Sequence, residues 1–233
     1  MIGVIVPAHN EEKCLDACLH ALLQAARHPQ LDGEKVQIVV VLDACVDGTL
    51  DVARRYPDVV VVEVEHRNVG RTRGEGVALL IEAGARWIAC TDADTVVAPD
   101  WLTNQLAYGA DVVCGVVEVA DWSHHGLHIR RQYESRYRDE ENHRHIHGAN
   151  LGFSAPAYLA AGGFPPLTVH EDVGLVRALE ANGARVAWSR SVRVTTSARL
   201  DCRAKGGFGD YLVALHNYHE ALGTRAETER PGA

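Results

Sequence analysis

The sequence has no long apolar segment, and this sets the first limit on what the protein can be. No stretch approaches the roughly 20 apolar residues that a helix needs to cross a bilayer. The amino terminus reads Met-Ile-Gly-Val-Ile-Val-Pro. It has no basic residue before its apolar run, and the run is too short for a secretory signal. We therefore expect a cytoplasmic protein without an integral membrane segment.

Cysteine pairs are also lacking. The six cysteines form no Cys-x-x-Cys pair, and several of them lie in apolar runs. A free cysteine in such a run behaves as a small hydrophobic residue. Without a secretory signal, a disulfide framework is not expected in a chain of this length.

An excess of basic residues is missing as well. The chain of 233 residues carries 23 Lys and Arg against 31 Asp and Glu, a net charge of -8. This charge argues against a nucleic-acid-binding protein, which normally presents a basic face. It does not exclude a nucleotide ligand, because a bound metal can supply local positive charge. The composition is otherwise that of a globular protein large enough for one well-formed core.

Short apolar segments alternate with segments of helical spacing through the first half of the chain. The predicted strands span residues 2–6, 36–42, 59–64, 87–91 and 111–117, and the predicted helices span residues 11–27, 48–55, 71–83 and 99–107. Strands that are apolar throughout and alternate with helices indicate a parallel sheet covered on both faces. The right-handed crossover rule then predicts an α/β fold with a doubly wound sheet.

The second half of the chain is less regular. Helices are predicted at residues 127–142, 156–161, 171–182 and 207–222, a loop at 143–154, and short strands at 186–188 and 192–194. Residues 224–233 are polar, contain Pro and Gly, and are expected to form a flexible tail. The prediction is a single domain over residues 1–223.

Polar side chains gather where the predicted strands end. His9 and Asn10 follow the first strand, Asp43 the second, and Asp92 and Asp94 the fourth. Ligands of doubly wound sheets bind at the carboxyl ends of the strands. These side chains therefore mark the expected binding site.

The segment Asp92-Ala93-Asp94 gives the sharpest chemical signal. Two carboxylates at the end of a buried strand are costly unless a cation meets them. Mg²⁺ and Mn²⁺ prefer oxygen ligands and often take one or two carboxylates together with substrate phosphates. The alternative is a solvated turn whose acidic residues cap the next helix.

Two further segments allow a functional and a purely structural interpretation. Residues 68–76 form a Gly-rich helix start with Arg71 and Arg73, which could bind an anion or could simply be a flexible loop. Glu171 and Asp172 open another helix. The helix dipole alone favours acidic residues there, but one of the two carboxylates could also act as a general base.

The order of these motifs resembles that of the family 2 glycosyltransferases with the GT-A fold. The matching segments are residues 6–12, 40–49, 68–76, 91–95 with Pro99, 162–164 and 171–175. The resemblance covers roughly residues 1–195. It implies a single Rossmann-like domain with a mostly parallel central sheet flanked by helices. Within it, residues 1–118 would form the nucleotide-binding half and residues 119–223 the acceptor-binding half.

The resemblance also implies a donor site. The residues it places along the nucleotide are Pro7, Ala8, Asn10, Glu11, Asp43, Arg73, Asp92 and Ala93. Asp43 would bind the base, usually uracil, and Asp92 would lie near the ribose. Asp94 would bind the Mg²⁺ or Mn²⁺ ion that bridges the diphosphate. Gly74 stands where relatives commonly have Asn.

The implied reaction is an inverting transfer of a hexose from a nucleotide-diphosphate sugar, most often a UDP-sugar, to an acceptor hydroxyl. Asp172 matches the catalytic base, with Glu171 as its neighbour. The metal would stabilise the diphosphate leaving group as a Lewis acid. The residues implied at the sugar and the acceptor are His147, Gly148, Ala149 and Asn150.

One feature departs from the family pattern. Many relatives carry a late His that completes the metal site, but residues 192–200 contain none. Either the metal keeps an extra water molecule or Arg199 meets the diphosphate instead.

The sequence also contains a histidine-rich tract: His124, His125, His128, His143, His145 and His147. Such tracts can bind Zn²⁺, although no Cys or carboxylate spacing completes a known pattern here. The alternative is an acceptor-side loop with polar contacts.

Two other functions are weighed against sugar transfer. A nucleotidyltransferase would show a Gly-rich run and a basic residue after the first strand, where this chain has His9-Asn10-Glu11-Glu12. A non-catalytic nucleotide-sugar-binding protein would not need both Asp94 and Asp172. The sequence does not identify the acceptor, although Arg130, Arg131, Tyr133 and Tyr137 are candidate contacts.

Overall fold

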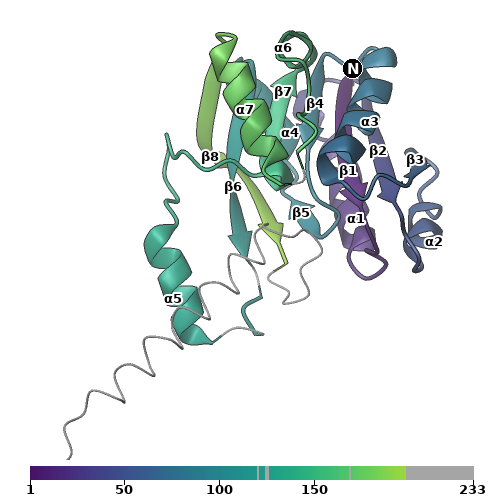
Figure 1. Cartoon of the computed structure of the whole chain (residues 1–233), viewed down its shortest axis with the longest axis horizontal. Helices are drawn as coiled ribbons and strands as arrows, with labels where there is room; N and C mark the ends of the chain where they lie inside the picture. Colours follow the sequence, from purple (N-terminus) through teal and green to yellow (C-terminus); the bar gives the residue numbers. More distant parts are fainter. Residues whose placement is uncertain (120, 124–125, 168, 198–233) are drawn as a thin grey trace, which may run out of the picture.

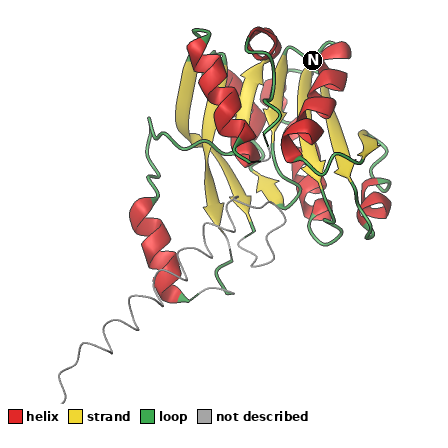
Figure 2. Ribbon diagram, in the orientation of Figure 1, coloured by secondary structure: helices red, strands yellow, loops and turns green. Residues whose placement is uncertain are grey.

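The computed structural model describes residues 1–119, 121–123, 126–167 and 169–197. Their centre is one eight-stranded sheet with the order β3-β2-β1-β4-β7-β6-β8-β5. Helices lie in front of this sheet and behind it (Figures 1 and 2). The predicted α/β class, with a covered and mostly parallel sheet, is confirmed.

The elements have the following bounds. The strands are β1 (Ile2–Ala8), β2 (Val36–Asp43), β3 (Val59–Val64), β4 (Trp87–Cys90), β5 (Thr95–Val97), β6 (Val112–Val119), β7 (Leu151–Ser154) and β8 (Val186–Thr196). The helices are α1 (Leu15–Ala26), α2 (Thr49–Ala53), α3 (Val69–Glu82), α4 (Trp101–Ala107), α5 (Leu127–Arg136), α6 (Ala155–Ala160) and α7 (Glu171–Ala181), with short 3₁₀ turns η1 (Pro29–Leu31) and η2 (Gly148–Asn150).

The sheet combines a parallel half with a mixed half. β1 pairs in parallel with β2 and β4, and β2 pairs in parallel with β3. Beyond β4 comes β7, which is antiparallel to both β4 and β6. β8 then pairs in parallel with β6 and antiparallel with β5. The carboxyl ends of β1, β2 and β4 therefore meet at one edge of the sheet.

The core consists of two apolar layers, one on each face of the sheet. Alternate residues of β1 decide the faces, because successive side chains of a strand point in opposite directions. Val4 and Val6 pack with α1, α2 and α4, whereas Ile5 packs with α3, α6 and α7. α5 stands apart from these layers, where Ile129 and Tyr133 form a small cluster of their own (Figure 1).

Several predicted elements differ from the structure. The loop predicted at 143–154 contains η2 and β7, a four-residue strand too short to show a periodicity. The two short strands predicted at 186–188 and 192–194 are one strand, β8. Its register shift lies opposite Gly115 and Val116. Ser189 stabilises this irregularity, because its hydroxyl accepts hydrogen bonds from the amides of Ser191 and Val192 at 3.0 and 3.1 Å.

Other boundaries also differ. The sequence analysis missed β5, and the predicted helix 127–142 ends at Arg136, after which Tyr137 is extended. The predicted helix 207–222, the tail 224–233, Arg199, His124 and His125 lie outside the described residues. Within the described part of the chain, no helix is both long enough and apolar enough to span a bilayer.

Candidate active site

The loops that follow β1 and β2 are tied to each other by side chains. Asn10 accepts a hydrogen bond from the amide of Val46 at 2.8 Å through its Oδ1. The amide of Glu11 donates to Thr49 Oγ1 at 2.7 Å, although the two residues are far apart in the sequence. Pro7 and Ala8 end β1 in a buried position, and Glu11 is buried as well. The structure therefore brings the predicted residues 7–11 and the loop after Asp43 into one rigid corner.

Asp43 holds the start of α3. Its carboxylate accepts hydrogen bonds from the amides of Arg67 at 2.7 Å and Asn68 at 3.0 Å, and from the hydroxyl of Thr72 at 2.7 Å. Burial alone would raise the pKa of Asp43, but the Thr72 hydroxyl and the backbone amides outweigh it and lower the pKa. Any contact of Asp43 with a nucleotide base therefore comes in addition to this structural role.

Four non-glycine residues around this edge have left-handed backbone conformations. They are Asn10, Ala44, Arg67 and His170, with φ values of 57°, 52°, 48° and 60°. Each follows a strand or precedes a helix that carries a candidate site residue. Such conformations cost on the order of 1–3 kcal/mol each and cluster at functional sites.

Arg73 lies in the interior between two of the candidate motifs. Its side chain is 4% exposed. Nη2 donates to Asp92 Oδ1 at 2.5 Å, and Nη1 contacts Glu171 Oε1. Burial alone would lower the pKa of Arg73, but the carboxylates of Asp92 and Glu171 raise it above its usual range, so the guanidinium is charged. The sequence analysis predicted Arg73 along the nucleotide, and the structure buries its side chain between Asp92 and Glu171.

Asp172 is the half-buried carboxylate of the pair that opens α7. Its Oδ2 accepts a hydrogen bond from the amide of Gly148 at 2.7 Å, and its Oδ1 accepts one from the amide of Val173 at 2.8 Å. The first of these bonds joins the start of α7 to η2. The predicted base Asp172 and the predicted sugar-binding segment are thus in direct contact.

Asp94 is partly exposed and lies among hydroxyl groups. The hydroxyls of Thr95 and Thr196 lie 3.4 and 3.5 Å from Asp94 Oδ1. Carboxylate and hydroxyl oxygens suit a hard cation such as Mg²⁺ or Mn²⁺. The described residues contain no group of three or more His, Cys, Asp or Glu that could hold a metal. The role of Asp94 as a metal ligand therefore stays a prediction.

The turn η2 is held from within the protein. Asn150 is fully buried and accepts a hydrogen bond from Trp101 Nε1 at 2.8 Å. Its amide group donates to the carbonyls of Val116 at 2.8 Å and Val192 at 2.9 Å. Asn150, predicted at the sugar, thus joins α4, β6 and β8, while Gly148 and Ala149 present main chain beside Asp172.

His147 precedes η2 and is neutral. The hydroxyl of Tyr137 accepts a hydrogen bond from the amide of Val117 at 2.8 Å and lies 3.2 Å from His147 Nε2, to which it can donate. Burial, with smaller contributions from His145 and His143, lowers the pKa of His147 to about 3. The rings of His145 and His147 stack on that of Tyr137. His143, His145 and His147 are thus packed in one aromatic stack with Tyr137, and no zinc ligand set is found among the described residues.

Two residues of the site region escaped the sequence analysis. Thr72 binds Asp43, and Thr196 lies beside Asp94. Thr72 lies within a helical repeat, where a hydroxyl has no distinguishing signal. Thr196 lies in residues 192–200, where the family resemblance implies a metal ligand, and its hydroxyl oxygen is of the type that a hard cation prefers.

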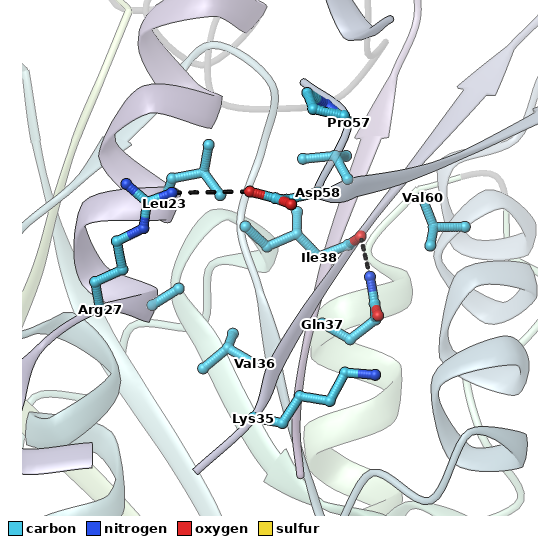
Figure 3. Close-up of a pocket in the computed structure, with 11 residues that line it drawn as sticks. Leu23, Arg27, Lys35, Val36, Gln37, Ile38, Pro57, Asp58 and Val60 are labelled. Atoms are coloured by element: carbon cyan, nitrogen blue, oxygen red, sulfur yellow. Dashed lines mark hydrogen bonds and ion pairs between the residues drawn. The ribbon is translucent and has the colours of Figure 1, made fainter. Parts of the chain in front are cut away.

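A hollow of about 480 Å³ lies elsewhere on the molecule. Its lining includes Arg27 at the end of α1, Lys35 before β2, and Asp58 before β3 (Figure 3). It therefore lies at the amino ends of β2 and β3, away from the carboxyl edge that carries Asp43 and Asp92. An exposed ion pair of 3.8 Å joins Arg27 and Asp58 there. None of the candidate site residues contributes to this hollow.

The comparison with known families agrees with the geometry. The sequence pattern of glycosyl transferase family 2 matches residues 3–159. The chain therefore belongs to glycosyl transferase family 2. No curated protein sequence matches the chain significantly.

Solved glycosyltransferase structures share the fold. A fragment of TarS from S. aureus in complex with UDP superposes with a TM-score of 0.65 at 19% identity, covering 84% of this chain and 60% of the fragment. The mannosyltransferase PcManGT from Pyrobaculum calidifontis, in complex with GDP-Man and Mn²⁺, gives 0.64 at 21% identity, covering 86% and 57%. GalNAc-T7 with UDP, GalNAc and Mn²⁺ gives 0.63 at 15% identity, covering 86% and 44%. The expected GT-A fold is confirmed, and the chain spans about three fifths or less of the length of these structures.

Proposed function

We propose that this chain transfers a sugar from a nucleotide-diphosphate sugar, with UDP-sugar as the first candidate, to an acceptor hydroxyl with inversion at the anomeric carbon. One observation carries the proposal. Asp94 and Asp172 come from segments far apart in the sequence, and the carboxylates next to them, Asp92 and Glu171, both bind Arg73. A candidate metal ligand and a candidate base are thereby fixed at the same edge of the sheet.

The donor would lie along the corner built by residues 7–11 and the loop after Asp43. Asp92 keeps one carboxylate oxygen beyond its bond to Arg73, and this oxygen can accept a hydrogen bond from a ribose hydroxyl. Asp94 would hold Mg²⁺ or Mn²⁺, which supplies charge stabilisation to the departing diphosphate. Thr196, whose hydroxyl lies 3.5 Å from Asp94 Oδ1, belongs to residues 192–200, the stretch that corresponds to the one where many relatives have a metal-binding His.

Asp172 would take the proton of the attacking acceptor hydroxyl. A carboxylate positioned for this task contributes about 10²–10⁴-fold in rate. Hydrogen bonds from the amides of Gly148 and Val173 hold the carboxylate in one orientation. This preorganisation means that little of the barrier is spent on aligning the base.

The solved structures support a nucleotide-sugar donor but do not decide which nucleobase it carries. The TarS fragment has been solved with UDP-GlcNAc, and PcManGT with GDP-Man and Mn²⁺. Thermal unfolding of the chain with UDP-, GDP- and dTDP-sugars in the presence of Mn²⁺ distinguishes these donors, because a tightly bound ligand stabilises the folded state by mass action. The proposal fails if no nucleotide-sugar raises the melting temperature and none is cleaved.

The metal assignment is tested by Asp94→Asn. This change keeps the shape of the side chain but removes the charge that binds the cation. Calorimetric titration with UDP and Mn²⁺ should show binding to the parent protein and at least tenfold weaker binding to the variant. Normal Mn²⁺-dependent titration of the variant would refute the role of Asp94.

The assignment of the base is tested by Asp172→Asn. We expect unchanged binding of UDP and Mn²⁺ and a loss of turnover of 10²-fold or more. Turnover retained in this variant, but lost in Glu171→Gln, would assign the base to Glu171.

A further inference from the structure

Arg73 connects the part of the site proposed for the donor to the part that carries the proposed catalytic base, Asp172. It projects from α3 and contacts Asp92, which follows β4, and Glu171, the first residue of α7. These three residues belong to segments that are otherwise separate along the chain. Because the whole side chain of Arg73 is 4% exposed, its guanidinium is shielded from solvent.

Gly148 extends this connection to Asp172, the proposed catalytic base. A Cβ atom at Gly148 would lie 2.5 Å from both Nη1 and Nη2 of Arg73, so the guanidinium packs directly against the main chain of η2. The amide of the same Gly148 donates to Asp172 Oδ2 at 2.7 Å. Arg73 thus supports the residue that orients Asp172.

Gly70 lets α3 approach α7 closely enough for these contacts. A Cβ atom at Gly70 would lie 2.9 Å from Cβ of Glu171. The Gly-rich start of α3, which the sequence suggested as an anion-binding loop, therefore also has a packing reason. The absence of a side chain at Gly70 leaves room for Glu171, the first residue of α7.

We propose that Arg73 is a positioning residue that does not touch the donor but holds Asp92, Glu171 and the Gly148 segment in one arrangement, and so keeps the carboxylate of Asp172 aligned for catalysis. This inference rests on the proposed function. Its physical basis is the planar fork of arginine, which can serve two carboxylates in fixed directions. A lysine keeps the charge but offers one compact ammonium group and cannot reproduce both contacts together with the packing against Gly148.

The test compares three variants with a matched control. Arg73→Lys removes the fork, Glu171→Gln removes one of its charged partners, and Gly148→Ala pushes the guanidinium from its place. Arg86→Lys is the control, because Arg86 also binds a carboxylate through two nitrogens, that of Glu34 at 2.7 and 2.6 Å, but lies before β4 at the opposite edge of the sheet. Release of nucleoside diphosphate from UDP-GlcNAc and from GDP-mannose, and calorimetric binding of UDP and GDP with Mn²⁺, are measured for each.

We expect kcat to fall roughly 10- to 100-fold in Gly148→Ala and Glu171→Gln, because small displacements of a catalytic group have effects of this size. The Kd for the nucleoside diphosphate should change less than about threefold in both. The double variant Arg73→Lys with Glu171→Gln should turn over within about threefold of Arg73→Lys alone, because coupled residues are not additive. Arg86→Lys should behave like the parent protein.

Three outcomes overturn parts of this scheme separately. If Gly148→Ala keeps its full kcat, or if the losses of the double variant multiply, the positioning role is refuted. If Arg73→Lys weakens nucleotide binding as much as it reduces kcat, Arg73 acts on the donor. If the parent protein neither binds nor cleaves any of the UDP-, GDP- and dTDP-sugars, the proposed function itself fails. If Arg73→Lys does not fold, as judged by circular dichroism, the kcat and Kd values of Gly148→Ala and Glu171→Gln still test the positioning role.

Discussion

At the scale of single residues, polar side chains near the site do structural work that their sequence motifs do not reveal. Asn150 lies in a segment that the family resemblance places at the sugar. Its side-chain amide, however, forms hydrogen bonds with Trp101, Val116 and Val192. Asp43 is likewise engaged with the start of α3 before any ligand binds. Residue type and position predicted where these side chains lie but not which partners they have.

Asn150→Ala should therefore destabilise the protein. The change leaves the Trp101 Nε1 group and the carbonyls of Val116 and Val192 buried without their partner, and each such group costs about 1–3 kcal/mol. We expect a loss on the order of 3 kcal/mol in the free energy of unfolding, measured by urea titration. Asn104→Ala is the control, since Asn104 makes one exposed hydrogen bond to the carbonyl of Ser191 at 3.3 Å. Equal effects of the two changes would contradict this account.

Asp43 should make stability depend on pH. Its pKa is lowered in the folded state, so its stabilising contribution is present above the unfolded value of about 3.9 and is lost as the pH falls through the lower folded value. Asp43→Asn removes that contribution and turns an acceptor into a donor facing the amides of Arg67 and Asn68. We expect a loss of about 1–3 kcal/mol at pH 7 that shrinks below about pH 4. A difference between the two proteins that does not vary with pH would refute the role of the charge.

At the scale of elements, the distance between α3 and the sheet is set by one glycine. A Cβ atom at Gly76 would lie 2.1 Å from Cδ1 of Ile5 and 3.0 Å from Cγ2 of Val41. Gly74, two residues earlier on the same helix, has nothing within 4 Å of such an atom. The same substitution therefore has opposite effects at two neighbouring positions.

Gly76→Ala should push α3 away from the sheet. Overpacking of this kind typically costs 1–3 kcal/mol and outweighs the gain of about 1 kcal/mol from the better helix propensity of alanine. Gly74→Ala should keep only that gain. Thermal and urea unfolding should thus rank Gly74→Ala at or above the parent and Gly76→Ala below it. Because α3 also carries Arg73, Gly76→Ala should lower turnover as well, and a stable, fully active Gly76→Ala protein would contradict the close packing.

The elements also show how far the sequence could predict the fold. Strands with a continuous apolar run were located almost to the residue, as for Val36–Asp43, predicted at 36–42, because burial on both faces leaves a continuous apolar signal. β7 escaped because Gly152 and Ser154 interrupt its apolar run, and β5 escaped because it has only three residues. The candidate site was predictable as a set of motifs at strand ends. The buried ion pairs of Arg73 were not, because they join segments whose contact depends on the complete fold.

At the scale of the whole molecule, the two predicted halves share one sheet. β8 comes from the second half of the chain and pairs with β6 and β5, which come from the first. β7 likewise lies between β4 and β6. No gap in the sheet therefore corresponds to a boundary after residue 118, which falls within β6.

The fragment of residues 1–118 should consequently not fold by itself. Without β7 and β8, β6 loses both of its neighbours in the sheet, β5 loses its antiparallel partner, and the apolar layer of α3 loses α6 and α7. We expect the full chain to unfold in one cooperative transition in urea, and the fragment to show no such transition by circular dichroism or tryptophan fluorescence. A cooperative transition of the fragment would mean that the nucleotide-binding half is a domain of its own. In that case Asp94 would be held without Thr196, and the metal site would have to form from the first half of the chain alone.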